Sequence, residues 1–202
     1  MLDDIDASLA AYDGDAEKTA FLHAARIAME GFSELVRGYA RAAEQKADAA
    51  DNAAARVHFS EMAARCDRVA MEAPRTFRDA LQLVWLTYIA FAYEGRYAMA
   101  FGRLDQYLYP FFARDLADGT LTEEEATDDL ASVFMKIGER RTLVGGDDVS
   151  NIAIGGVKPE DGSDATNALS FCVLRAVRRC FIPGPNLSAR IHKDTPKEFL
   201  DA

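Results

Sequence analysis

The sequence is poor in the residues that build metal centres and disulfide frameworks. Its 202 residues include only three cysteines and three histidines. These are Cys66, Cys172, Cys180, His23, His58 and His192. No CxxC pair or HExxH-like cluster is present, and an odd, low cysteine count argues against a disulfide scaffold or a zinc site. The glycine pairs at 145–146 and 155–156 also lack the lysine and helix start of a phosphate-binding loop.

Net positive charge and long apolar runs are missing as well. The formal net charge is −10, which argues against nucleic acid or an anionic membrane as a partner. The longest apolar run, 81–93, is interrupted by polar residues and is too short to span a bilayer. The beginning, MLDDIDASLAAYDGD, is acidic and unlike a signal or transit peptide. We therefore expect a cytoplasmic protein without a membrane association.

Periodicity and capping signals predict a largely helical chain up to about residue 145. Apolar residues recur every three or four positions, Phe21 to Tyr39 in the first long helix and Phe59 to Val69 in the second. Thr76 with Asp79, and Thr122 with Glu125, have the spacing of helix-starting capping pairs. Pro110 should kink or divide its helix. The predicted helices cover 16–47, 51–72, 77–93, 104–116 and 123–141, with a loop bracketed by Gly95 and Gly102.

The pattern changes after residue 150. NIAIGG (151–156) is short, apolar and β-branched, which indicates a strand. A helix over 164–179 and a second strand from Asn186 follow. Thr195, as N-cap before Pro196, then marks another helix start. Strand–helix–strand–helix order is typical of an α/β barrel or parallel sheet, so the fold class is α/β, mostly helical in this segment. Two strands alone cannot form a stable sheet of this type, so we interpret the chain as a fragment.

Three ordered motifs carry a resemblance to a known family. They are FGRLDQYLYPFFARDL, NIAIGG followed by DGSDATNALSF, and PNLSARIHKDTPKEFL. Each is similar to a segment of the glycyl radical enzymes, which include pyruvate formate-lyase and the cobalamin-independent glycerol dehydratase. The match begins near Lys18 and resembles the dehydratase and decarboxylase branch more than pyruvate formate-lyase itself.

The resemblance implies a fold and a domain assignment. Members of the family fold as a barrel of two half-barrels of parallel strands wrapped by helices. Residues 1–202 are then a partial pyruvate formate-lyase-type domain. Its helical layer would cover about 16–145, and the strand–helix–strand start of the barrel would cover about 150–202. The segment from 101 to 111, rich in aromatic residues, would seat a helix against the barrel, and Arg103 and Asp105 would tie a loop to a helix start.

The resemblance also implies radical lyase chemistry in anaerobic metabolism. In the family, a backbone glycyl radical generates a thiyl radical on a barrel cysteine, which attacks a small polar substrate. A separate activating enzyme with S-adenosylmethionine and an iron–sulfur cluster installs the radical. The resemblance places both radical residues after Ala202. We therefore expect this chain alone to be inactive and to bind no cofactor. The complete enzyme would be a lyase, a dehydratase or a formate acetyltransferase-like enzyme, and it would form a homodimer.

Five residues are candidates for lining the substrate pocket. By resemblance, EGRYAMAF is where relatives often carry a histidine and serines that hold substrate hydroxyls, but Tyr97, Ala98 and Ala100 stand there instead. Alternation along NLSARIH would point Arg190 and His192 toward the barrel lumen. Structural ion pairs near the strand end are an equally weighted alternative for these two residues. No catalytic residue and no metal ligand is predicted.

The remaining cysteines and histidines have structural interpretations. Cys66 and Cys172 lie on apolar helical stripes, where a free cysteine is expected as a small core residue. Cys180 follows two arginines that favour a thiolate, although packing in the barrel wall is the preferred interpretation. His23 and His58 fall on polar helix faces and should be solvated.

Three hypotheses for the function remain. The first is a fragment of a glycyl radical enzyme that catalyses dehydration, decarboxylation or related C–X cleavage. The second is a non-catalytic helical interaction or scaffold protein. The third is one half of a split enzyme whose partner chain carries the radical residues. The substrate cannot be named from these residues.

Overall fold

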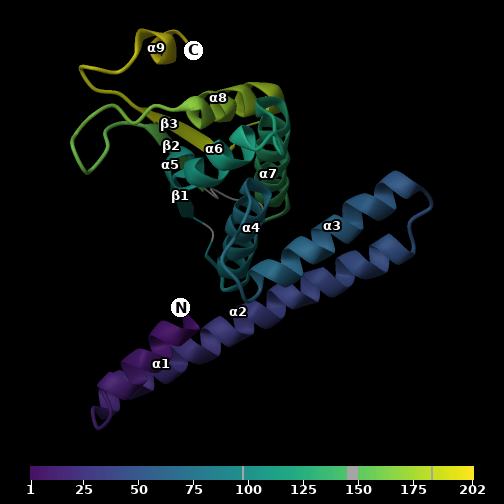
Figure 1. The fold of residues 1–202 in the computed structure, drawn as a ribbon, viewed down its shortest axis with the longest axis vertical. Helices are drawn as coiled ribbons and strands as arrows, with labels where there is room; N and C mark the ends of the chain where they lie inside the picture. The colour runs from purple at the N-terminus through teal and green to yellow at the C-terminus, as the bar shows by residue number, and fades with distance from the viewer. Residues whose placement is uncertain (97, 145–149, 183) are drawn as a thin grey trace. The chain divides into compact units, whose positions relative to one another are not determined.

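The computed structural model describes residues 1–96, 98–144, 150–182 and 184–202. The chain divides into two compact units, Met1–Ala73 and Pro74–Ala202. The first is entirely helical in its described secondary structure, and the second contains helices and a three-stranded sheet (Figure 1). The prediction of an α/β segment that is mostly helical is confirmed.

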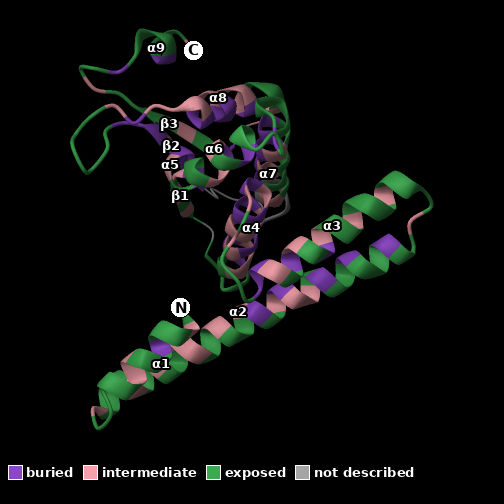
Figure 2. Cartoon of the chain, viewed as in Figure 1, coloured by how far each residue is buried: buried purple, intermediate pink, exposed green. Residues whose placement is uncertain are grey.

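The first unit consists of α1 (Leu2–Ala11), α2 (Ala16–Asp48) and α3 (Ala53–Val69), and α2 packs against both of the others. Asp15 and Asn52 begin α2 and α3, because their side chains accept hydrogen bonds from backbone N–H groups of the first turns. Figure 2 shows buried residues gathered where α2 and α3 run side by side. Small residues dominate this contact: Ala40, Ala43, Ala47, Ala63 and Cys66.

The predicted apolar face of α2 is only partly correct. Val36 is fully buried, but Phe21 is 72% exposed. The buried stripe follows Ser33, Val36 and Ala40 toward the end of the helix instead. Small side chains allow two helix backbones to approach closely, so alanines rather than aromatic residues form the contact.

The second unit contains, in chain order, α4 (Phe77–Tyr93), β1 (Met99–Arg103), α5 (Leu104–Tyr107), α6 (Tyr109–Ala117), α7 (Glu123–Val144), β2 (Ser150–Gly155), α8 (Ala168–Cys180), β3 (Asn186–Arg190) and α9 (Lys197–Asp201). The strands are parallel in the order β1-β2-β3, so β2 is central and β1 and β3 are edges. Met99 pairs with Ser150, and Asn151 pairs with Asn186. All three strands therefore end at the same edge of the sheet.

The expected loop between Gly95 and Gly102 is wrong for its second half, because β1 occupies Met99–Arg103. Met99 and Phe101 are half-buried and alternate with exposed Ala100 and Gly102. The strand was hard to recognise because Gly102 has a φ of +67° and the register with β2 shifts between Ala100 and Gly102. The segment expected to be a helical layer up to 145 thus contains a strand.

The expected helix boundaries around α4 to α7 are largely confirmed. Thr76 and Asp79 form a reciprocal capping box, and Thr122 and Glu125 exchange the same kind of hydrogen bonds. The chain divides at Leu108, just before Pro110, into α5 and α6. Proline lacks the amide donor of a continuing helix, which accounts for the division.

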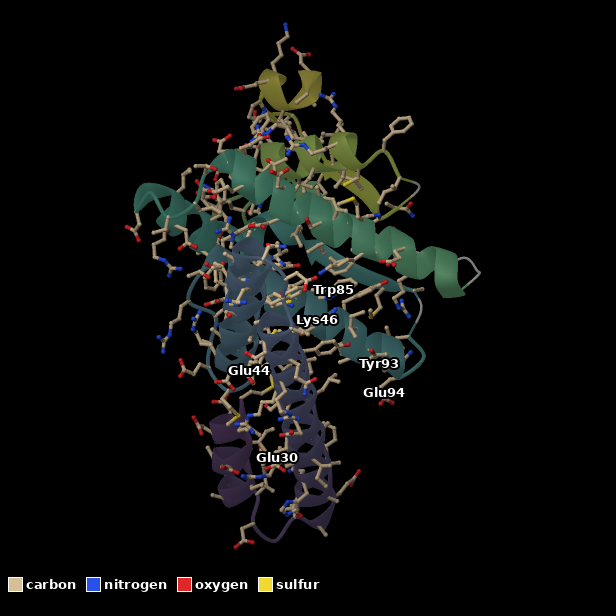
Figure 3. All side chains as sticks on the ribbon, turned by 90° about the vertical axis from the view of Figure 1, so that its right-hand side faces the viewer. Glu30, Glu44, Lys46, Trp85, Tyr93 and Glu94 are labelled. Carbon is tan, nitrogen blue, oxygen red and sulfur yellow. The ribbon has the colours of Figure 1, made fainter. Side chains whose placement is uncertain are left out.

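Helix α4 is less buried than its apolar sequence suggests. Phe77, Leu81 and Leu86 belong to the core, but Tyr93, labelled with Glu94 in Figure 3, is 70% exposed. Phe91 is 53% exposed. The helix therefore buries its first half on several sides and leaves large apolar side chains exposed near its end.

Two helix starts near the end of the chain differ from the prediction. Helix α8 begins at Ala168 rather than near 164, because Asn167 and Ser170 form a capping box there. Helix α9 has Pro196 as its N-cap and no side-chain cap. The Thr195 hydroxyl accepts from the His192 amide at 2.8 Å instead, so the predicted Thr195 cap is wrong.

A buried carboxylate joins three elements of the second unit. Asp105 on α5 is fully buried, and its Oδ2 accepts from the Gly155 amide at 2.8 Å and the Ser170 hydroxyl at 2.5 Å. Its own carbonyl accepts from the Asn167 side chain at 3.0 Å. Asp105 therefore ties α5 to the end of β2 and the start of α8, more than the local link between a loop and a helix start that was expected.

Replacing Asp105 by alanine should lower the free energy of unfolding by about 3 kcal/mol, because the Gly155 amide and the Ser170 hydroxyl would lose their acceptor. Urea denaturation followed by circular dichroism measures this change. Asp118→Ala removes an exposed carboxylate from the same unit and should change stability by less than about 0.5 kcal/mol. Equal effects of the two substitutions would contradict the role given to Asp105.

Candidate functional site

The four predicted pocket residues that the structure describes fall into two groups at opposite ends of the sheet. Ala98 and Ala100 lie at the start of β1, whereas Arg190 ends β3 and His192 follows it. Tyr97 lies outside the described residues. Met99 pairs with Ser150 and Arg190 with Gly155. At about 3.3 Å per residue, the two groups are thus roughly 16 Å apart along the strands.

A cavity of about 650 Å³ lies beside β1, between α4 and the α5–α6 segment. This volume is in the range of small-molecule sites. Ala98 and Ala100 both line it, with Leu83, Thr87, Phe91, Met99, Tyr107 and Phe111 among the other lining residues. The sequence argument identified two of these residues and missed the contributions of α4, α5 and α6.

The hydroxyl groups in the cavity wall already have protein partners. Thr87 donates to the Leu83 carbonyl at 2.8 Å, and Tyr107 donates to the Phe101 carbonyl at 3.0 Å. The Tyr88 hydroxyl lies 3.1 Å from Ser150 Oγ and accepts from Arg140 at 3.1 Å. Burial raises the pKa of Tyr107, with a smaller contribution from Asp105. The described wall therefore offers apolar surface and neutral, hydrogen-bonded hydroxyls.

His192 makes contacts of the kind proposed in the structural alternative. Its Nε2 lies 2.9 Å from Asp164 Oδ1, and its Nδ1 accepts from the Asp194 amide at 3.3 Å. An accepting Nδ1 assigns the proton of the neutral ring to Nε2, which then donates to Asp164. Asp164 also accepts from the Thr166 amide at 3.0 Å. His192 thus holds the loop before α8 against the segment after β3.

Two arginines and a glycine pair meet where the strands end. Arg103 ends β1, Gly155 ends β2 and Arg190 ends β3. A Cβ atom added to Gly156 would lie 3.8 Å from Arg103 Nη2 and 3.1 Å from Arg190 Cβ, so glycine is needed for this close approach. Sequence reasoning missed the grouping because β1 was not recognised as a strand.

The three cysteines are unsuited to reactive roles. Cys66 and Cys172 are buried, as predicted. Burial raises the pKa of Cys172, although Arg175 at 3.1 Å from its sulfur acts in the opposite direction. Burial also raises the pKa of Cys180, outweighing Arg179, which pairs with Glu124 and Asp128. The alternative of a Cys180 thiolate favoured by the neighbouring arginines is therefore not supported, and Cys180 packs against the core, in line with the preferred interpretation.

Neither a candidate metal cluster nor a helix able to span a membrane is found in the described part of the chain. His23 and His58 are exposed, as predicted. Within residues 1–96, 98–144, 150–182 and 184–202, no three metal-ligating side chains are close enough together to hold an ion. In the same ranges, no helix is both long and apolar enough to cross a membrane.

Thiol labelling should distinguish the cysteines. At pH 8 the half-buried Cys180 should react with a disulfide reagent faster than Cys66 and Cys172, and all three should react alike in urea. Three equal labelling rates in the native state would refute this assignment.

The pKa values of the Cys172 and Cys180 thiols are raised in the folded state, so these thiols contribute stability below the unfolded thiol pKa of about 8.5. This contribution is lost as pH rises further. The free energy of unfolding, measured by urea denaturation, should therefore fall between pH 8 and 10.

Comparison with known proteins finds one family throughout. A sequence profile described as pyruvate formate lyase-like matches residues 1–202. The chain is 34% identical over 195 residues to the probable dehydratase YbiW of Escherichia coli strain K12. This alignment covers 90% of the chain and 24% of YbiW. It is 31% identical over 182 residues to the 4-hydroxyphenylacetate decarboxylase glycyl radical subunit of Clostridioides difficile, covering 85% of this chain and 20% of the subunit.

The fold comparison agrees. The crystal structure of a glycyl radical enzyme from Archaeoglobus fulgidus superposes with a TM-score of 0.89 and 32% identity. The superposition covers 98% of this chain and 27% of that one. The chain thus spans about a quarter of the length of the proteins that it resembles, and its helices and small parallel sheet correspond to one segment of their barrel.

Proposed function

Because this chain belongs to the pyruvate formate lyase-like family, in which its relatives are glycyl radical dehydratases and decarboxylases, we propose that it is part of an enzyme that cleaves a C–X bond by radical chemistry. The reaction class is dehydration, decarboxylation or a related lyase step on a small polar metabolite, in anaerobic metabolism. The observation that carries the proposal is the family match over all 202 residues, together with the agreement in fold.

The proposed contribution of this segment is architectural. Residues of about 16–145 supply mainly the helical layer, and about 150–202 supply the strand–helix–strand start of the barrel within one domain of 1–202. Two features support this. The strands are all parallel, and both β1 and β3 have an unpaired edge within the described sheet. Open edges of this kind are where further parallel strands would be added.

The proposed radical residues lie outside these 202 residues. A thiyl radical must reach both a glycine and the substrate, yet Cys66 and Cys172 are buried in helix contacts. Cys180 is half-buried, and its sulfur contacts the Ala131 carbonyl on α7 at 3.3 Å. In this proposal an activating enzyme with S-adenosylmethionine and an iron–sulfur cluster acts on the complete protein. The complete protein is proposed to be a cytoplasmic homodimer, and this segment is proposed to bind no cofactor itself.

The proposed substrate pocket includes the start of β1. Ala98 and Ala100 line the cavity beside that strand, and Tyr97 is adjacent in sequence. An alanine methyl neither donates nor accepts a hydrogen bond, so this wall does not grip substrate hydroxyls. Arg190 and His192 remain proposed lining residues from the opposite end of the sheet, and the distance between the two ends means that they would contact a different part of the pocket.

Anaerobic activation tests the function directly. The complete protein, incubated with an activating enzyme, S-adenosylmethionine and a reductant, should show a glycyl radical doublet in electron paramagnetic resonance. The 202-residue chain under the same conditions should show none, and it should not cleave glycerol, choline or hydroxyproline. A stoichiometric doublet from the chain alone would mean that the radical site lies within these residues.

Substrate choice should not depend on one position. In the complete protein, Ala98→Ser restores one hydroxyl in a wall where Ala100 and the engaged hydroxyls of Thr87 and Tyr107 still offer no free partner. Glycerol dehydration, measured as aldehyde formation, should therefore stay below about 1% of the rate with the natural substrate, since several contacts set specificity. Strong activity on glycerol from this change alone would refute that view.

A further inference from the structure

The carboxyl ends of the three strands carry two arginine side chains without a carboxylate partner. Arg103 donates from Nη1 to the Val157 carbonyl at 2.9 Å, but its buried Nε and Nη2 have no hydrogen-bond partner in the described residues. Asp105, two residues further, directs Oδ2 to Gly155 and Ser170, and its buried Oδ1 also has no hydrogen-bond partner in the described residues. Arg190 is exposed and, within the described part of the chain, forms no ion pair.

The two side chains meet at one glycine. A Cβ on Gly156 would lie 3.8 Å from Arg103 Nη2, 3.1 Å from Arg190 Cβ and 3.3 Å from Arg190 Cδ. Arg190 thus packs over the glycine next to the buried edge of Arg103. Gly156 has a φ of +87°, a conformation that a residue with a side chain rarely adopts.

We propose that Arg103 and Arg190 bind an oxyanion, such as a carboxylate or phosphate group, over the Gly155-Gly156 turn. Two arginines that approach the same glycine add their positive charges, which an anion would offset, and buried N–H donors without an acceptor cost free energy. Guanidinium groups present paired donors that match the oxygens of carboxylates and phosphates. The carboxyl ends of parallel strands are also a common place for ligands in α/β folds.

Arg190 serves as the movable half of this site. Its side chain is exposed, whereas Arg103 is held by Val157 and by its position at the end of β1. When Arg190 turns aside, the Nε–Nη2 edge of Arg103 opens to the anion, and Arg190 then closes over it. The site does not depend on radical chemistry, so it stands or falls separately from the proposed activity.

Nuclear magnetic resonance of arginine Nε–Hε groups tests the proposal. The 202-residue chain, labelled with ¹⁵N-arginine, is titrated with inorganic phosphate and separately with acetate, at constant ionic strength maintained with chloride. The signals of Arg103 and Arg190, assigned by substitution, should shift together along one saturable curve for at least one of the two anions. Arg190→Gln should weaken binding at least tenfold while leaving the fold intact.

Arg178→Gln is the matched control, because it removes another exposed arginine, on α8 of the same unit. It should leave the anion affinity unchanged within about twofold. Three results would overturn the proposal: no saturable shift with either anion, an equal loss of affinity in Arg178→Gln, or unchanged affinity in Arg190→Gln. If Arg103 is instead neutralised by Asp105 in solution, Asp105→Asn will create the binding that the unaltered chain lacks, which also overturns the proposal.

Discussion

The buried carboxylate of Asp105 is the interaction on which the second unit depends. It accepts from the amide that ends β2 and from the hydroxyl that caps α8, while the backbone of the same residue holds the Asn167 side chain. Buried polar groups in folded proteins are normally hydrogen-bonded, and here Oδ2 has two donors while the buried Oδ1 has no partner in the described residues. The arrangement therefore specifies how a short helix, a strand end and a helix start meet.

This constraint has consequences for the neighbouring strand ends. Asp105 Oδ2 accepts from Gly155 and Ser170. Arg103 donates from Nη1 to the Val157 carbonyl, and its Nε and Nη2 have no hydrogen-bond partner in the described residues. Gly155 and Gly156 both have positive φ and both meet side chains from β3 or α9 at close range. The same packing that fixes the sheet thus leaves cationic groups gathered at its carboxyl end, and it separates them from the apolar cavity at the other end.

The two ends of the sheet differ in the chemistry of their side chains. Near Ala98 and Ala100 the wall is apolar, and the Thr87 and Tyr107 hydroxyl groups in it donate to backbone carbonyls. Near Arg190 the groups are charged and His192 is anchored by Asp164. The segment therefore has an apolar cavity at one end of the sheet and charged, hydrogen-bonded side chains at the other.

Much of the helical architecture could be predicted from local sequence. Capping pairs such as Thr76 with Asp79 act within one turn, and Pro110 interrupts a helix through its own ring, so both signals are readable without tertiary information. The ordered motifs around 101–116, 151–171 and 185–200 likewise identified the family. Burial of Cys66 and Cys172 followed from their apolar stripes.

Tertiary structure alone decided which residues meet. Strand β1 has only five residues, and its left-handed glycine and register shift obscure the alternation by which a strand is recognised, whereas pairing with β2 stabilises it. The partners of Asp105 lie 50 and 65 residues away in the chain, at Gly155 and Ser170. The juxtaposition of Arg103 with Arg190 depends on the register of three strands. Sheet pairing and packing determine contacts between residues that are so far apart in the chain, and a local sequence pattern carries no information about them.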